Sequence, residues 1–356
     1  MVTGLLAGVD IGGSGTRGCL VEEGRIIACS ALPADLSSST AVGDLAIAVL
    51  SKVLADSGHE IDQLASIGVG IPGQVSEGKV RHAANLGIGK AGFDLGGYVS
   101  SATQVPTLVE NDMTVAAYGA YALTSADSSV RSLIFIGIGT GVAAGIVLEG
   151  EVYRGSRGLA GEFGHVPMGT GIECPCGSTG CLETVIGATA IAKEWDLAPV
   201  SSLFLSAAQG ESQAVALAAR AIDHLAQAMW WLAAAYDPDV FYIGGGVGVG
   251  APSIGQMVAT RWTELAGSSE FARRVLDPDR IRMYDLEEPV GAYGAALLGA
   301  RQIGERQMTE HFSSSRETAS LGTLEKDKKT RVTPKGFGEP RATRQQEEES
   351  QCVNDG

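Results

Sequence analysis

Two segments of the chain share one local pattern: a strand, a glycine-rich turn and a second strand. The first contains Asp10 and the sequence GGSGTRG, and the second contains the sequence GTG (139–141) between apolar runs at 132–138 and 142–148. Glycine lets backbone N–H groups approach a bound anion closely. A pattern that recurs in this way predicts two related halves, each beginning with a β-meander.

The composition is that of a globular protein with an acidic surface. Hydrophobic residues make up 45% of the 356 residues, and 41 acidic against 26 basic residues give a net charge of −15. Such a surface repels polyanions and argues against nucleic acid as a partner, although glycine-loop N–H groups can still bind a nucleotide. No apolar run approaches the ~20 residues of a membrane helix, and no cationic segment precedes the first apolar residues. We therefore expect a cytoplasmic protein without a signal peptide.

Periodicity and breaker residues predict alternating helices and strands between the two meanders and after them. The expected helices are 42–55, 113–123, 211–235 and 291–303, and the expected strands are 65–71, 107–110, 239–243 and 281–286. Beyond Gln307 the composition becomes polar and almost without apolar residues. Such a segment buries too little surface to offset its ordering entropy, so we expect it to be disordered.

Asp10 stands at the end of the first strand, directly before the glycine turn. A turn of this composition suits a phosphate, and a carboxylate beside it could hold Mg²⁺ directly or through water. The same residues also fit an ordinary hairpin turn. The second glycine turn is weaker evidence by itself, and its value is that it repeats the first. Two such loops facing each other would hold a triphosphate from both sides.

Three of the six cysteines lie within eight residues. Cys174, Cys176 and Cys181 follow His165, and the residues between them are Pro, Gly, Ser and Thr, which suit a tight loop. Three thiolates and one imidazole form the closed tetrahedral donor set of a structural zinc site. In a cytoplasmic chain, metal binding is also more usual than disulfides. The pattern predicts zinc, and the alternative is a set of buried core cysteines.

Two carboxylates bracket this cysteine loop. Glu162 lies three residues before His165, and Glu183 lies two residues after Cys181. A metal-bound loop would hold both carboxylates rigidly, and carboxylates with an imidazole suit a polyhydroxylated ligand. Asp112 is a third acidic candidate, at the boundary between a strand and an alanine-rich helix. Without the cysteine loop, Glu162 and Glu183 would be interpreted as solvated surface residues.

Six segments resemble the ROK family (repressors, open reading frames and kinases). In chain order they are DIGGSGTR, GVGIPG, VENDM, IGIGTGVAAGIVLEGEVYRGSRGLAGEFGHV, CPCGSTGCLE and DVFYIGGGV, and they span about residues 5–303. AGEFGH followed by CPCGSTGCLE is the most specific match. The resemblance implies an α/β protein with the actin-like, ribonuclease-H-like fold and a sugar site between two domains. The expected domains are residues 1–112 plus 290–304, residues 113–289, and a disordered tail at 305–356.

The resemblance further implies an ATP-dependent sugar kinase that uses Mg²⁺ and Zn²⁺. Asp112 matches the family's catalytic base, which would accept the proton of a sugar hydroxyl. His165 would bind zinc through one ring nitrogen and the sugar through the other. The implied sugar-binding residues are Asn85, Asn111, Asp112, Glu162, His165 and Glu183. The implied nucleotide-binding residues are Gly12, Gly13, Thr16, Arg17, Gly139, Thr140, Gly141, Gly245 and Gly246, with Asp10 for magnesium and His165, Cys174, Cys176 and Cys181 for zinc.

The substrate is left open by these motifs. Glucose is expected because it is frequent in the family, which would make the chain a glycolytic glucokinase, while N-acetylmannosamine, N-acetylglucosamine, fructose and allose are alternatives. The first turn is longer than the family's GGTK pattern, with Ser14-Gly15 inserted and Arg17 in place of lysine. That turn is similar to polyphosphate-using glucokinases, but those lack the cysteine loop, so ATP is the expected donor.

Two alternatives come from other functional classes. A sugar-responsive repressor of this fold needs an N-terminal helix-turn-helix domain, for which the loop at Asp10 leaves no room, and the acidic charge disfavours DNA. A catalytically inactive sugar-binding protein is the second alternative, and the intact Asp10, Asp112 and glycine loops argue against it. The expected partners are therefore a hexose and ATP, in a homodimer or homotetramer.

Overall fold

The computed structural model describes residues 4–13, 15–33, 38–83, 86–124, 129–284 and 288–305. All of them belong to one compact unit, residues 1–307. The expected tail from residue 306 onward lies outside the described residues, and so does Asn85. One compact unit contains both halves of the fold, so the expected domain boundaries stay predictions.

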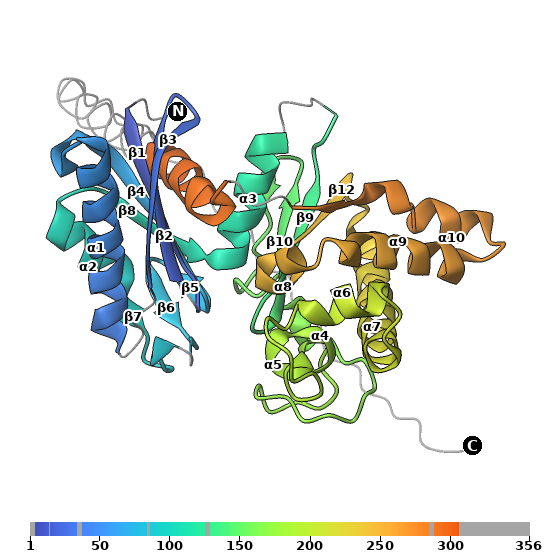
Figure 1. Cartoon of the computed structure of the whole chain (residues 1–356). Helices are drawn as coiled ribbons and strands as arrows, with labels where there is room; N and C mark the ends of the chain where they lie inside the picture. The colour runs from blue at the N-terminus through green and yellow to red at the C-terminus, as the bar shows by residue number, and fades with distance from the viewer. Residues whose placement is uncertain are drawn as a thin grey trace, which may run out of the picture. The chain divides into compact units, whose positions relative to one another are not determined.

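Two five-stranded sheets with the same topology form the fold (Figure 1). The first has the order β3 (Arg25–Pro33), β2 (Gly15–Glu22), β1 (Leu5–Ile11), β4 (Leu64–Ile71) and β8 (Thr107–Asn111). The second has the order β11 (Glu151–Val152), β10 (Val142–Leu148), β9 (Leu133–Ile138), β12 (Val240–Gly244) and β13 (Ile281–Met283). In each, a three-stranded antiparallel meander continues into two parallel strands. The predicted pair of related halves is confirmed.

Helices cover both faces of the first sheet, which is why β1 and β4 are almost continuously apolar and buried. One face packs against α1 (Ser39–Ser57) and α2 (Leu95–Thr103). Helix α1 begins after the capping hydroxyl of Ser38 and ends before Gly58, which caps it with a φ of 73°.

The helix of residues 290–305 packs against the other face of the first sheet. Glycines in the strands allow this close approach. A Cβ atom on Gly8 would lie 1.8 Å from the carbonyl oxygen of Ala292, and one on Gly68 would lie 1.8 Å from that of Ala295. The backbone of this helix therefore rests directly on β1 and β4.

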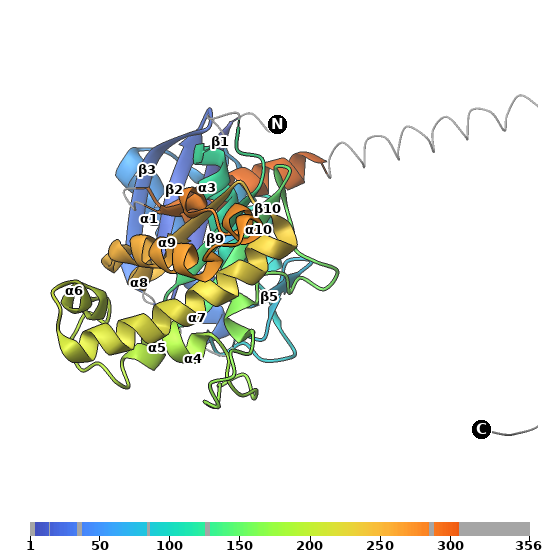
Figure 2. The same cartoon turned by 90° about the vertical axis from the view of Figure 1, so that its right-hand side faces the viewer.

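The second sheet is also covered on both faces. Helices α7 (Ser212–Tyr236) and α9 (Ser253–Ala266) cover one face and lie side by side (Figures 1 and 2), with Trp262 donating a hydrogen bond to the carbonyl oxygen of Ala226. Helix α3 (Asp112–Thr124) covers the other face and connects the two sheets in sequence. Among the described helices, none is both long enough and apolar enough to cross a bilayer.

The predicted long elements are present, with boundaries that differ by a few residues, whereas several short elements and one longer helix were not predicted. These are α2 and the segments α4 (Glu183–Ile186), α5 (Ala188–Ile191), α6 (Ser202–Ala208), α8 (Gly245–Gly250) and α10 (Glu270–Val275), the longer helix α9, and a small sheet of β5 (Gln74–Ser76), β6 (Lys79–Arg81) and β7 (Phe93–Asp94). Short elements such as β5 and β7 contain too few residues for a period to be recognised.

Candidate active site

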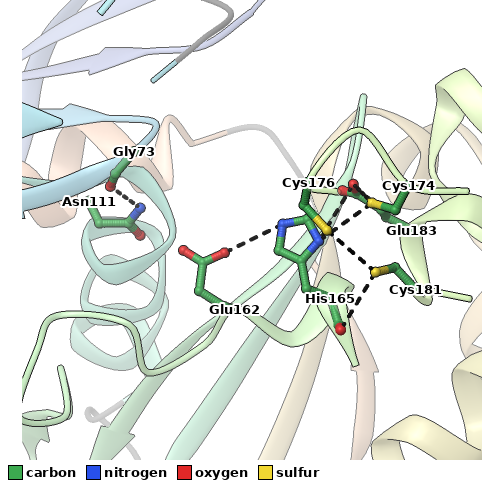
Figure 3. A network of polar contacts seen from close by, with 8 residues as sticks. All are labelled: Gly73, Asn111, Glu162, His165, Cys174, Cys176, Cys181 and Glu183. Atoms are coloured by element: carbon green, nitrogen blue, oxygen red, sulfur yellow. Dashed lines mark hydrogen bonds and ion pairs between the residues drawn. The ribbon is translucent and has the colours of Figure 1, made fainter. Parts of the chain in front are cut away.

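The cysteine loop brings its four predicted metal ligands together (Figure 3). One ligand atom from each of His165, Cys174, Cys176 and Cys181 lies within 4.8 Å of all the others. The sulfur atoms of Cys176 and Cys181 are 3.7 Å apart, and that of Cys174 is 3.8 Å from Nδ1 of His165. Zinc–sulfur bonds of about 2.3 Å in a tetrahedron give sulfur–sulfur edges of about 3.8 Å. The donor set therefore fits a tetrahedral zinc ion in both chemistry and spacing.

Backbone hydrogen bonds close this loop without help from a regular element. The amide of Cys174 donates to the carbonyl of Ser178, and the amide of Gly177 donates to the carbonyl of Cys174, each at 2.9 Å. Gly177 and Gly180 have φ values of 90° and 82°, a conformation that favours glycine. The local sequence thus specifies the turn that carries the thiols.

The imidazole of His165 lies between two carboxylates (Figure 3). Its Nδ1 faces Cys174 and is 3.7 Å from Oε1 of Glu183, while its Nε2 is 3.8 Å from Oε2 of Glu162. One ring nitrogen therefore faces the sulfur cluster, and the other faces away from it toward Glu162. This arrangement allows the ring to bind a metal and a second ligand at the same time.

Asn111 and Asp112 lie where β8 ends and α3 begins, as predicted. The side-chain oxygen of Asn111 caps the helix by accepting hydrogen bonds from the amides of Met113 (2.9 Å) and Thr114 (3.1 Å). Its Nδ2 donates to the carbonyl oxygen of Gly73 at 3.2 Å (Figure 3). Asp112 accepts a hydrogen bond from the amide of Met113 at 2.9 Å. These contacts fix the direction of the first helical turn and of the Asp112 carboxylate.

Three carboxylates interact electrostatically across this region. Burial raises the pKa of Asp112 to about 6, and the charge of Glu162 adds to the effect, while hydrogen bonds from Met113 and Asn111 oppose it. Burial and the charge of Asp112 raise the pKa of Asp10 to about 7, against the opposing charge of Arg17. Both side chains keep some solvent contact, yet desolvation is the largest cause in each case. The charge of Glu162 thus acts on Asp112, and the charge of Asp112 acts on Asp10.

The two predicted glycine loops meet, and the predicted nucleotide-binding residues Gly245 and Gly246 lie nearby at the start of α8. A Cβ atom on Gly13 would lie 3.9 Å from Oγ1 of Thr140, so the first loop faces the second. A Cβ atom on Gly245 would lie 2.6 Å from the carbonyl oxygen of Ile138, so the start of α8 packs against the strand that leads into the second loop. Gly245 also has a φ of 78°. The amide-rich turns are therefore grouped in one region, next to Asp10.

Thr16 differs in its burial from the other predicted nucleotide-binding residues. Thr16 is fully buried on β2, and its hydroxyl has no hydrogen-bond partner among the described residues. The other eight predicted residues are at least partly exposed. Arg17 is the register partner of Asp10 across the β1–β2 pair. Its guanidinium, rather than the Thr16 hydroxyl, is therefore available on the surface beside the turn.

The cysteine loop is tied to the second glycine loop. A Cβ atom on Gly141 would lie 2.6 Å from Oε2 of Glu183, so a larger residue at this position would require the Glu183 carboxylate to move. The amide of Ala188 donates to the carbonyl of Gly139 at 2.8 Å, and the amide of Thr189 donates to the carbonyl of Thr140 at 3.3 Å. A displacement of the cysteine loop would therefore be transmitted to the glycine loop.

Comparison with known proteins identifies the family of the chain. The sequence profile of the ROK family matches residues 6–302. The chain belongs to the ROK family.

Among its ROK relatives, a glucokinase from Halalkalibacterium halodurans is 32% identical over 323 residues, which cover 83% of this chain and 94% of that protein. An N-acetylmannosamine kinase from Yersinia pseudotuberculosis is 33% identical over 264 residues, covering 72% of this chain and 87% of that protein. The crystal structure of a ROK family glucokinase from Streptomyces griseus in complex with glucose and AMPPNP is similar with a TM-score of 0.70 and 26% identity, covering 84% of this chain and 100% of that one. The predicted actin-like, ribonuclease-H-like fold is confirmed.

A small cavity lies beside Asn111 and Glu162 in this ROK protein. Glu110 and Arg154 also contribute to its wall, and sequence reasoning assigned no role to either. Both residues belong to the quoted motifs, Glu110 to VENDM and Arg154 to the long segment before AGEFGH. The sequence could not predict their pairing, because the two residues are 44 positions apart.

Proposed function

We propose that this ROK family sugar kinase transfers the γ-phosphoryl group of ATP to a hexose hydroxyl, with glucose as the preferred acceptor and Asp112 as general base. One observation carries the proposal. Asp112 begins α3 directly after Asn111, which shares a cavity with Glu162, and the charge of Asp112 raises the pKa of Asp10 at the glycine loops, so Asp112 lies where a phosphate side and a sugar side would meet.

Asp112 has the properties of a base for this reaction. A pKa of about 6 leaves the carboxylate ionised at neutral pH and still basic enough to accept a proton. The cap formed by Asn111 orients the residue at the start of α3. Phosphoryl transfer depends mainly on positioning and charge neutralisation, so an oriented carboxylate next to the bound sugar is the main protein contribution to proton transfer.

The proposed sugar contacts are Asn111, Glu162, His165 and Glu183. With Nδ1 of His165 facing the thiols, the proton of a metal-bound ring resides on Nε2, which becomes a donor for a sugar hydroxyl. Glu162 and Glu183 are acceptors on either side of this ring. Zinc, held by His165 and the three cysteines, would supply rigidity to the loop that carries these groups.

On the nucleotide side, the amides of the glycine loops are the proposed phosphate ligands. Asp10 is the proposed magnesium ligand, and a divalent cation there would offset the repulsion between Asp10 and Asp112 that contributes to the raised pKa of Asp10. Magnesium supplies neutralisation of phosphate charge in such reactions. Gly245 and Gly246 are proposed to lie on the adenosine side.

The choice of glucose is supported by the glucokinase relative, which this chain matches over 94% of that protein's length, and by the neighbouring structure that binds glucose and AMPPNP. N-acetylmannosamine is the second candidate, because a kinase of that name is similar at 33% identity. The two sugars differ at C2, where an acetamido group needs more space than a hydroxyl.

A substrate panel tests the proposal. The full chain would be assayed for sugar-dependent phosphate transfer with glucose, N-acetylmannosamine, N-acetylglucosamine, fructose and allose, each with ATP or polyphosphate as donor. We expect the highest kcat/KM for glucose with ATP. Phosphorylation of none of these sugars would refute the kinase proposal, and a preference for N-acetylmannosamine would refute the choice of glucose. Light scattering would test the predicted homodimer or homotetramer, and the cytoplasmic location stays a prediction.

A further inference from the structure

Glu110 and Arg154 form a partly buried ion pair in the wall of the cavity. Nε of Arg154 lies 2.5 Å from Oε2 of Glu110, and the side chain of Glu110 is 9% exposed while that of Arg154 is 34% exposed. Glu110 belongs to β8 of the first sheet, and Arg154 follows β11 of the second sheet. The pair therefore joins the two halves of the fold at the place where Asn111 and Glu162 line the same cavity.

Each partner is directly connected to one side of the proposed sugar site. Oε1 of Glu110 accepts a hydrogen bond from the amide of Asn111 at 2.9 Å, so the same carboxylate holds the residue that caps α3. On the other side, the carbonyl of Arg154 accepts a hydrogen bond from the amide of Ala160 at 3.1 Å, which closes the loop just before Glu162. The carbonyl of Gly161 accepts a hydrogen bond from a strand of the second sheet at 2.8 Å.

The pair is not arranged for maximal stability. Nη2 of Arg154 is shielded from solvent and has no hydrogen-bond partner among the described residues. An unpaired buried donor is destabilising, and buried ion pairs are often no more stabilising than hydrophobic residues of similar size. Stability therefore does not explain why this guanidinium lies at the cavity wall with one nitrogen unpaired, and we look for a functional reason.

We propose that the Glu110–Arg154 pair is a positioning element of the sugar site, which sets the separation between Asp112 and Glu162. Neither member needs to touch the sugar, because Glu110 acts through Asn111 and Arg154 acts through the loop that ends at Glu162. The proposal rests on the proposed function for its kinetic consequence. A misplacement of about 1 Å between reacting groups can cost on the order of a hundredfold in rate.

Steady-state kinetics with matched variants is the first test. We expect Arg154→Met to lower kcat/KM for the sugar by about a hundredfold, with a KM for ATP close to that of the wild type. Arg154→Lys keeps the charge opposite Glu110 and should recover most of this loss. The double variant with Glu110→Gln should be no worse than Arg154→Met, since residues that act as a unit are not additive. The control is Arg131→Met, which removes an exposed pair with Glu149 and should change nothing.

Hydrogen exchange of residues 111–114 and 154–162 is the second test, because it needs no turnover. We expect faster exchange in both segments for Arg154→Met and no change for Arg131→Met. If the wild type phosphorylates no hexose while Arg154→Met still exchanges faster, the proposed function is refuted and the positioning role is retained. Unchanged exchange, or a wild-type kcat/KM in Arg154→Met, would overturn the positioning role. If Arg154→Met does not fold, the double variant, which leaves no buried charge unpaired, is judged by the same outcomes.

Discussion

Replacing Asp112 with asparagine removes the negative charge of the side chain and keeps its size and shape. An asparagine oxygen can still accept the hydrogen bond that the amide of Met113 donates to Asp112. The change removes a carboxylate whose pKa burial raises from 3.8 to about 6. It also removes a negative charge that raises the pKa of Asp10. The variant should therefore lose catalysis and gain stability.

The gain in stability follows from proton linkage. A carboxylate with a higher pKa in the folded state binds more protons in the folded than in the unfolded protein, so its contribution to stability is lost as the pH rises from about 4 to above 6. The difference between 3.8 and about 6 corresponds to about 3 kcal/mol. Because the side chain keeps some solvent contact, we expect Asp112→Asn to stabilise the protein by ~1–3 kcal/mol at pH 7.5 and by almost nothing near pH 4.

The loss in catalysis follows from the proposed role as base. A positioned general base contributes roughly 10²–10⁴-fold to a rate. We expect kcat of Asp112→Asn to fall by at least about a hundredfold, with little change in sugar affinity. In the wild type, kcat should rise with pH to a plateau above about 6, as the carboxylate loses its proton, and this limb should be absent in the variant.

Three measurements check the reasoning. Denaturant unfolding at pH 4.5 and 7.5 gives the stability difference, calorimetry gives the sugar affinity, and a coupled assay gives kcat. Asp196→Asn, at an exposed position, is the matched control and should change none of them. Wild-type turnover in Asp112→Asn would remove Asp112 from its role. A variant that is less stable than the wild type at pH 7.5 would refute the assignment of a destabilising buried charge.

The purified chain should contain about one zinc ion per molecule, and Cys176→Ser should lower the zinc content and weaken sugar binding, as measured by metal analysis and calorimetry. Gly141→Ala should lower the affinity for the sugar by about tenfold, measured by calorimetry, because its Cβ atom would displace the Glu183 carboxylate. Gly8→Ala should lower the free energy of unfolding by about 3 kcal/mol or more, because its Cβ atom would overlap the helix of residues 290–305. Gly89→Ala, in open space, is the control for Gly8→Ala and should have little effect on unfolding by denaturant.

Much of the candidate site could be predicted because its residues are close together in the sequence. The three cysteines lie within eight residues, and Asn111 and Asp112 are consecutive, so a local turn or a strand end suffices to place them. The two meanders were predicted for the same reason, since each consists of neighbouring strands joined by short turns. Short helices such as α4 and α5 were missed, because four residues show no period.

The amino-acid sequence by itself determined the family, the paired glycine turns and the zinc-type ligand set. The tertiary structure alone decided that Nδ1 of His165 faces the thiols, that Thr16 is buried, and that the first and second glycine loops face each other. It also decided that Glu110 pairs with Arg154. The physical reason is that burial and electrostatic interaction depend on distances between segments far apart in the chain, which only the packing of helices and sheets determines.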